Sequence, residues 1–319
     1  MRTLRIASRA SRLALAQAEI VKDLLHEILP DVEVSILEVT TKGDRDRSNF
    51  LYKSESVGLF TSEVENALLA GRAELAVHSL KDLPTSSRSE LTIAVILKRQ
   101  WPADALVAKE RAESIQQLPP GASVGTSSLR RIAQLKHLRA DITCVPLRGN
   151  VETRVRKVLD AQVDAAIVAC AGLYRLGLTD SISAVLPPNE FVIAPGQGAL
   201  AVQIRTADTQ LARTLSRLDD EPTRIATEAE RTVLAAMHGG CSIPLGVYAE
   251  TEKDTIRINA MIADLEGTTL IKRSASGPAS QSKRCALRLA EELLRSGGRE
   301  ILEQIRSNRT NIRPRDDKT

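Results

Sequence analysis

Basic side chains gather in one part of the chain, where turns follow apolar segments. Residues 126–156 contain seven lysines and arginines but only two acidic residues, and Arg130, Arg131, Arg148 and Arg154 stand at or beside turns. Where a strand passes into a helix, hydroxyl groups, main-chain amides and forked guanidinium groups together bind carboxylate or phosphate. The alternative is a solvated basic helix face. Because the arginines stand at turns, an anion site is favoured. Nucleic-acid binding would require interleaved aromatic residues, and this segment has few of them.

A second chemically suggestive segment follows a short apolar run at residues 75–77. Lys81 and Asp82 are adjacent there, just before Pro84. A carboxylate at a strand end acts as a general acid or base, or stabilises a cation. The same aspartate also fits a surface turn before proline, and spacing alone does not separate these two interpretations. His78 has no second metal ligand at suitable spacing, so we predict a structural histidine with satisfied polar atoms.

A third candidate is Cys241, which follows Gly239 and Gly240 at the expected end of a helix. Glycine permits left-handed backbone and close approach of a ligand to the main chain. Cys144 and Cys170 instead lie in apolar patterns typical of strands. No Cys/His/Asn protease signature accompanies Cys241, which favours attachment over hydrolysis. From the residues alone it is a candidate reactive thiol.

Composition excludes several classes of protein. The chain has 319 residues, 44 Lys plus Arg against 40 Asp plus Glu, and 43% hydrophobic residues, which indicates a globular protein that is not polybasic. Only 2% of residues are aromatic, too few for a base-stacking nucleic-acid binder. The longest apolar run, 165–174, is shorter than the roughly 20 residues that span a membrane, and Gln17 and Glu19 interrupt any signal-peptide core. The four spaced cysteines predict neither disulfides nor zinc. We therefore expect a cytoplasmic protein with no metal, nucleic-acid or membrane partner.

The elements that must position these residues fall into three sets. The first predicts strands at 4–7, 32–36, 75–77 and 91–97, a helix after an N-cap at Ser11 that ends before Pro30, and a helix at 62–70 opened by a Ser62–Glu65 capping box. The second predicts strands at 105–108, 122–125, 142–145, 164–169 and 200–204, with helices at 128–138, 151–160 and 208–218. Alternating strands and helices indicate α/β lobes with largely parallel sheets.

The third set groups its strands together. It predicts a helix at 223–237, strands at 244–250, 255–263 and 268–275, and a helix at 281–295. This order is typical of a small α+β domain with an antiparallel sheet. The polar residues from 308 to 319 are expected to fray.

Several motifs, in order along the chain, resemble the porphobilinogen deaminase (hydroxymethylbilane synthase) family. They are residues 6–9 with Ser11 and Gln17, 78–84, 125–131, 147–151 with Thr153 and Arg154, 171–173 with Arg175, and 196–199. In addition, residues 230–246 are similar to the family's cofactor-attachment signature, with Cys241 at its centre. The resemblance therefore extends over nearly the whole chain.

The family resemblance implies an α/β fold with two lobes similar to type II periplasmic binding proteins and a small α+β C-terminal domain. Residues 1–98 and 197–218 would form the first lobe, 103–193 the arginine-rich second lobe, and 221–306 the domain with the cofactor cysteine. Residues 307–319 would be a disordered tail. The return of the chain to the first lobe is implied by the resemblance alone, because periodicity does not reveal which strands are neighbours.

The implied activity is that of a transferase in tetrapyrrole (porphyrin and heme) biosynthesis. It would condense four porphobilinogen molecules head to tail into hydroxymethylbilane and release ammonia at each step. A dipyrromethane held by a thioether to Cys241 would prime the chain. Asp82 would stabilise, through the pyrrole N–H, the azafulvenium cation that loss of ammonia creates, and would then help to remove a proton. A monomer whose small-molecule partner is porphobilinogen is expected.

The remaining site residues are implied position by position. Besides Cys241, the implied cofactor-binding residues are Lys81, Thr126, Ser128, Arg130, Arg131, Arg148, Gly149 and Arg154. The implied substrate-binding residues are Arg9, Ser11, Gln17, Lys53, Phe60, Arg175 and Gln197. Each pyrrole carries an acetate and a propionate, so the growing product needs many cationic donors.

The chain departs from the family pattern at a few positions. Val57 stands where the family usually has lysine, Arg12 where proline is common, and Trp101 where aspartate is common before Pro102. The loop 41–57 is expected to cover the active cleft.

Two other classes of protein compete with the transferase. A non-catalytic anion-binding protein with periplasmic-type lobes would explain the arginines but not the Gly-Gly-Cys segment, and a nucleic-acid binder is opposed by the net charge of +4.

Overall fold

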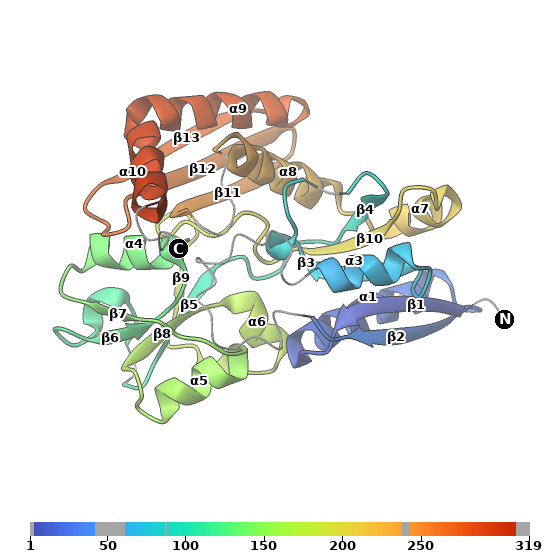
Figure 1. The fold of residues 1–319 in the computed structure, drawn as a ribbon, viewed down its shortest axis with the longest axis horizontal. Helices are drawn as coiled ribbons and strands as arrows, with labels where there is room; N and C mark the ends of the chain where they lie inside the picture. The colour runs from blue at the N-terminus through green and yellow to red at the C-terminus, as the bar shows by residue number, and fades with distance from the viewer. Residues whose placement is uncertain (1–2, 42–60, 87, 111, 238–242, 311–319) are drawn as a thin grey trace, which may run out of the picture.

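A computed structural model describes residues 3–41, 61–86, 88–110, 112–237 and 243–310 of the chain. Three sheets organise this part of the molecule, two with five strands and one with three (Figure 1). In each five-stranded sheet one strand is reversed and the other four point the same way. The predicted architecture of two α/β lobes and a small α+β unit is confirmed.

The first sheet has the order β2-β1-β3-β10-β4. Its strands are β1 (Thr3–Arg9), β2 (Glu33–Val39), β3 (Leu75–Ser79), β4 (Leu91–Ile96) and β10 (Leu200–Arg205). β1 runs parallel to β2 and β3, whereas β10 lies antiparallel between β3 and β4. The sheet is therefore largely parallel, as predicted, but a strand from much later in the chain completes it.

Three helices accompany this sheet, namely α1 (Arg12–Ile28), α3 (Ser62–Leu69) and α7 (Thr209–Leu215). Ser11 caps α1 as predicted, because its Oγ accepts the amide of Ala14 at 3.3 Å. The predicted Ser62–Glu65 capping box is wrong. Thr61 is the N-cap and makes no side-chain cap bond, while Glu65 turns inward and accepts a hydrogen bond from Gln203 Nε2 at 3.2 Å. A buried tertiary contact replaces the local one.

The second sheet has the order β7-β6-β8-β5-β9. Its strands are β5 (Asp104–Ala108), β6 (Ser123–Gly125), β7 (Thr143–Val145), β8 (Ala165–Ala169) and β9 (Ala184–Leu186), with helices α4 (Leu129–Leu138), α5 (Val151–Leu159) and α6 (Cys170–Arg175). The sequence did not predict the short edge strand β9. Cys170 begins α6 instead of lying in a strand, and it is buried there.

The third unit has helices packed on one face of an antiparallel sheet. It contains α8 (Glu221–Ala236), β11 (Leu245–Glu252), β12 (Thr255–Ala263), β13 (Leu270–Pro278), α9 (Ser282–Leu293) and α10 (Arg299–Thr310). Its core joins α8, α9 and α10 to the sheet and is built from small and branched apolar side chains. Fraying expected from residue 308 is wrong for 308–310, which continue α10. Residues 311–319 lie outside the described residues.

The two segments that connect the lobes meet the third unit at Glu230 of α8. Its fully buried carboxylate pairs with Arg99 through Oε2–Nη2 at 2.6 Å and Oε1–Nη1 at 2.8 Å. It also accepts the amides of Gly196 at 2.6 Å and Ala249 at 2.7 Å. Because Arg99 and Gly196 lie in different connecting segments, one side chain fixes both of them to β11. Among the described residues, no helix is long and apolar enough to cross a membrane.

Candidate active site

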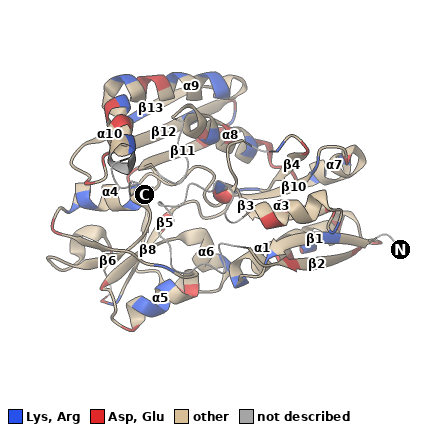
Figure 2. Cartoon of the chain, in the orientation of Figure 1, with Lys and Arg blue, Asp and Glu red and all other residues tan. Residues whose placement is uncertain are grey.

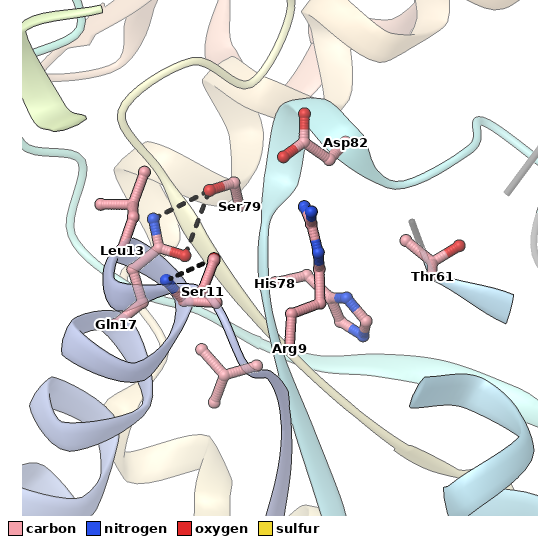
Figure 3. A pocket seen from close by; sticks show the side chains of 10 residues that line it. Arg9, Ser11, Leu13, Gln17, Thr61, His78, Ser79 and Asp82 are labelled. Carbon is pink, nitrogen blue, oxygen red and sulfur yellow. Dashed lines mark hydrogen bonds between the residues drawn. The ribbon is translucent and has the colours of Figure 1, made fainter. Parts of the chain in front are cut away.

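The first lobe presents a polar pocket at the carboxyl end of β3 (Figure 3). A single 3₁₀ turn, Leu80–Asp82, follows the strand and leaves the Asp82 side chain exposed. Arg9, the last residue of the neighbouring strand β1, lines the same pocket. The carboxyl ends of parallel strands meet at one sheet edge, which is why residues 73 positions apart in sequence face each other here.

The predicted residues of helix α1 complete this pocket. Ser11 and Gln17 both line it. Gln17 Nε2 donates to Ser79 Oγ at 2.9 Å, and Ser79 Oγ lies 3.2 Å from Gln17 Oε1 (Figure 3). This reciprocal contact fixes the buried Gln17 amide against β3. The structure therefore brings four sequence-predicted residues together, namely Arg9, Ser11, Gln17 and Asp82.

His78 corrects one expectation from the sequence. It is buried as predicted, but among the described residues its Nε2 has no hydrogen-bond partner. Burial lowers the pKa of His78 to about 4, because the charged imidazolium is poorly solvated there and Arg9 adds repulsion. The ring is therefore neutral at physiological pH.

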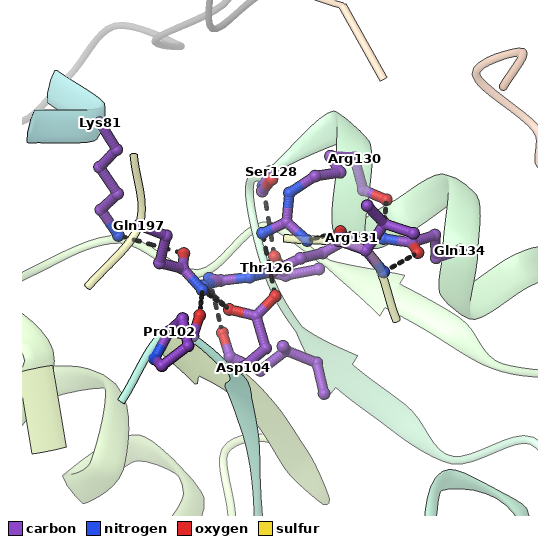
Figure 4. Close-up of polar contacts among 11 residues, drawn as sticks. Lys81, Pro102, Asp104, Thr126, Ser128, Arg130, Arg131, Gln134 and Gln197 are labelled. Atoms are coloured by element: carbon purple, nitrogen blue, oxygen red, sulfur yellow. Dashed lines mark hydrogen bonds and ion pairs between the residues drawn. The ribbon is translucent and has the colours of Figure 1, made fainter. Parts of the chain in front are cut away.

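The second lobe contributes two buried arginines from the first turn of α4 (Figure 4). Arg130 and Arg131 are only 4% and 6% exposed. Both contact Asp104, the first residue of β5: Arg130 Nη2 lies 2.9 Å from Oδ2, and Arg131 Nη2 lies 2.6 Å from Oδ1. Burial opposes the charge of Asp104, but the two guanidinium groups prevail and hold its pKa well below the usual value.

Gln197 links this cluster to the first lobe. Its Nε2 donates to Asp104 Oδ1 at 2.9 Å and to the carbonyl of Pro102 at 2.8 Å. Its Oε1 accepts a long hydrogen bond of 3.5 Å from Lys81 Nζ (Figure 4). Burial lowers the pKa of Lys81 to about 8, although Asp82 partly offsets this effect. Lys81 and Gln197 therefore belong to one polar network that spans both lobes.

Arg154 and Gly149 lie at the start of α5. The helix is capped by Asn150, whose Oδ1 accepts the amide of Thr153 at 2.9 Å, and Arg154 Nε donates to the carbonyl of Gly149 at 3.0 Å. Gly149 has φ of 107°, a conformation that favours glycine. Burial lowers the pKa of Arg154 to about 10, with Arg131 lowering it further and Asp82 raising it. Asp82 of the first lobe and Arg154 of the second thus interact electrostatically.

Two other predicted cofactor residues of the second lobe, Thr126 and Ser128, lie beside Arg130 and Arg131 (Figure 4). Thr126 is buried, and its Oγ1 accepts the amide of Ser128 at 3.2 Å. Arg148 is half-buried. Arg175, at the end of α6, donates from Nη2 to the carbonyl of Gly198 at 2.8 Å, so it contacts a connecting segment. Figure 2 places further basic residues along α4 and α5.

Three predicted site residues are outside the described residues: Cys241, Lys53 and Phe60. Val57 and almost all of the loop 41–57 are outside them as well. Sequence reasoning missed Asp104, the partner of Arg130 and Arg131. Its signal was an acidic residue at the head of an apolar strand in a chain segment rich in arginine, but an acid at a strand end is ordinary unless its partners are known.

Comparison with known proteins assigns the chain to a family. Residues 4–213 match the family model "Porphobilinogen deaminase, dipyromethane cofactor binding domain", and residues 225–295 match "Porphobilinogen deaminase, C-terminal domain". The chain belongs to the porphobilinogen deaminase family. The resemblance noted from the motifs is thereby confirmed, as is the expected dipyrromethane-binding character of the two lobes.

Curated relatives match over almost their full length. Porphobilinogen deaminase of Maridesulfovibrio salexigens is 43% identical over 305 residues, covering 96% of this chain and 99% of the relative. That of a Roseiflexus species is 44% identical over 300 residues, covering 94% and 98%. Among solved structures, the chain is similar to the methionine binding protein MetQ, with a TM-score of 0.43 and 12% identity over 68% of this chain and 89% of that one. The aliphatic sulphonate binding protein SsuA of Escherichia coli has a TM-score of 0.39 and 15% sequence identity, and the match covers 75% of this chain and 71% of that one.

Proposed function

We propose that this chain condenses four porphobilinogen molecules head to tail into hydroxymethylbilane, with release of ammonia, as a transferase of porphyrin and heme biosynthesis. Its family membership supports this activity. One structural observation carries the assignment of the site: Asp82 and Arg9 line the same polar pocket at the carboxyl ends of β3 and β1. Among the described residues that line this pocket, Asp82 is the only carboxylate.

The pocket of the first lobe fits the substrate. Arg9 and the Ser11 hydroxyl supply donors for the acetate and propionate groups of porphobilinogen, and the buried Gln17 amide fixes the wall behind them. Asp82 would accept a hydrogen bond from the pyrrole N–H. Loss of ammonia leaves a positive charge on the substrate pyrrole, and a nearby carboxylate stabilises that charge where it develops. After the new carbon–carbon bond forms, Asp82 takes the proton whose loss restores the aromatic ring.

The residues of the second lobe fit a dipyrromethane. Arg131 has a buried Nε with no hydrogen-bond partner among the described residues, and Asp104 supplies one negative charge against the two of Arg130 and Arg131. The unbalanced positive charge and the orphan donor suit the carboxylates of two linked pyrroles. When attached through Cys241, the dipyrromethane supplies the acceptor pyrrole for the first condensation. Lys81, Thr126, Ser128, Arg148, Gly149 and Arg154 would line its site.

The residues proposed to bind substrate and dipyrromethane come from both lobes, so the growing pyrrole chain would lie between them. The division of the protein into domains is therefore part of the proposal. The first lobe comprises residues 1–98 and 197–218, the second 103–193, and the third domain, with Cys241, 221–306. The placement of β10 in the first sheet supports this division. Arg175, which donates to the carbonyl of Gly198, and Gln197, which donates to that of Pro102, would bind the substrate. We further propose that the protein acts as a cytoplasmic monomer.

The test combines turnover with intact mass. The purified protein should convert porphobilinogen to hydroxymethylbilane, and its mass should exceed the sequence mass by two linked pyrrole units. Peptide mapping should place this adduct on Cys241 and leave Cys285, which is buried in α9, unmodified. A protein that binds pyrrole carboxylates without turnover or adduct would instead be a non-catalytic anion-binding protein, and the proposal would be wrong.

A further inference from the structure

Asp104 joins parts of the site that come from three regions of the sequence. It stands at the head of β5, directly after the segment that enters the second lobe, and it is fully buried. Its Oδ2 pairs with Arg130, and its Oδ1 accepts bonds from Arg131 and Gln197. Gln197 belongs to the returning segment and accepts the long hydrogen bond from Lys81. No motif of the sequence analysis contains Asp104.

We propose that Asp104 is a positioning residue for recognition of the pyrrole carboxylates: it fixes the orientation of Arg130 and Arg131 and, through Gln197, the position of Lys81. This inference rests on the proposed function. Asp104 does not need to touch the substrate or the dipyrromethane. It acts through the three side chains that it holds.

The geometry explains why one carboxylate can set the direction of two guanidinium groups. Each arginine uses one terminal nitrogen for Asp104 and the other for a main-chain carbonyl: Arg130 Nη1 donates to Val192 at 2.7 Å, and Arg131 Nη1 to Ile167 at 2.9 Å. A planar fork held at both prongs cannot rotate, so its three remaining N–H donors have fixed directions. For Arg131 these donors include Nε, which has no hydrogen-bond partner among the described residues.

Without the Asp104 charge, two buried cations would lose their counter-ion. Such groups recover solvation by leaving their positions, because an uncompensated buried charge is costly. Lys81 would also be affected, since the charge of Asp104 raises the pKa of Lys81 whereas Arg130 and Arg131 lower it. Removing that charge therefore shifts the pKa of Lys81 further down from about 8, and the ammonium loses its proton at a lower pH.

The test measures kcat/KM for porphobilinogen against pH in the wild type and in Asp104→Asn. We expect Asp104→Asn to carry less dipyrromethane on Cys241, and its alkaline limb to move down by about one pH unit after correction for the loaded fraction. Asp104→Glu keeps the charge and should restore much of the wild-type profile. The control is Asp164→Asn in the same lobe, which removes the charge of an exposed carboxylate that accepts hydrogen bonds of 2.7 and 2.8 Å from Ser123 and should leave the limb unchanged.

A second readout does not depend on turnover. Titration of the Lys81 ammonium by lysine-selective NMR should give a lower pKa in Asp104→Asn than in the wild type. If Asp104→Asn does not fold, the double variant D104N/R130Q is compared with R130Q alone, so that the two proteins differ only in the charge of Asp104, and the Lys81 pKa should be lower in the double variant. A wild type without bilane synthesis would overturn the proposed function. An unchanged Lys81 pKa together with an unchanged alkaline limb would overturn the role of Asp104 alone.

Discussion

Glu230 and Arg99 form a bidentate ion pair, with N–O distances of 2.6 and 2.8 Å, at the point where both connecting segments meet the third unit. Glu230 is fully buried and also accepts two main-chain amides, so its two oxygens serve four donors. The pair differs from the surface ion pairs of this chain in burial and in the number of elements that it joins. Loss of this pair should therefore destabilise the whole molecule and not a single lobe.

We expect Glu230→Gln to lower the free energy of unfolding by about 3–5 kcal/mol, because the Arg99 guanidinium is left buried without a counter-ion. Thermal unfolding followed by circular dichroism measures the effect. Glu252→Gln is a matched control. It breaks an exposed pair with Arg257 at 3.6 Å, which should contribute less than about 1 kcal/mol. Equal effects of the two substitutions would contradict the role given to Glu230.

Asp82→Asn should reduce kcat about 100-fold or more while the fold and the attached dipyrromethane persist. The amide accepts a hydrogen bond from a pyrrole N–H but cannot balance a full positive charge. Asp82→Glu should keep measurable activity, since the charge survives with displaced geometry. Stopped assays of hydroxymethylbilane, together with intact mass, separate loss of chemistry from loss of cofactor. Near-normal turnover by Asp82→Asn would refute the assignment.

His78 should make stability depend on pH in the acidic range. Its pKa is about 4 in the folded protein against 6.5 as the ordinary value, so the unfolded chain takes up the proton first as pH falls. Above pH 6.5 the ring is neutral in both states and His78 does not reduce the free energy of unfolding. As pH falls from 6.5 to 4, protonation of the unfolded chain lowers that free energy by about 3 kcal/mol. His78→Gln should flatten that decline in denaturant titrations, whereas His26→Gln, an exposed control on α1, should follow the wild type. Parallel curves for His78→Gln and the wild type would count against this account.

The sequence predicts those features that local chemistry determines. The Ser11 cap and the alternating strands of the third unit depend on residues close in sequence, and both are confirmed. The capping box failed because Glu65 has a better partner in Gln203, which is 138 residues away. Asp104 was missed for the same reason. Its role arises only when β5, α4 and the segment with Gln197 come together, and no local pattern encodes that meeting.

The last prediction separates two arginines by stage of product growth. Arg131 is held by Asp104 in the second lobe, beside the proposed dipyrromethane site, whereas Arg9 lines the Asp82 pocket of the first lobe. Arg131→Leu should therefore impair holoenzyme assembly. Arg9→Leu should retain the cofactor but stall later condensations, because a charged contact to one carboxylate contributes roughly 1.5–3 kcal/mol.

Mass spectrometry with limiting porphobilinogen counts the pyrroles on Cys241 in each variant. Arg9→Leu should accumulate short intermediates on a fully loaded enzyme, and Arg131→Leu should give mostly protein without the two-pyrrole adduct. Arg156→Leu, on the exposed side of α5, is the control and should give the wild-type ladder. The stages differ because each added pyrrole brings two more carboxylates, which must find cations that the earlier units do not occupy. Identical ladders for Arg9→Leu and Arg131→Leu would mean that the two lobes do not divide the work in this way.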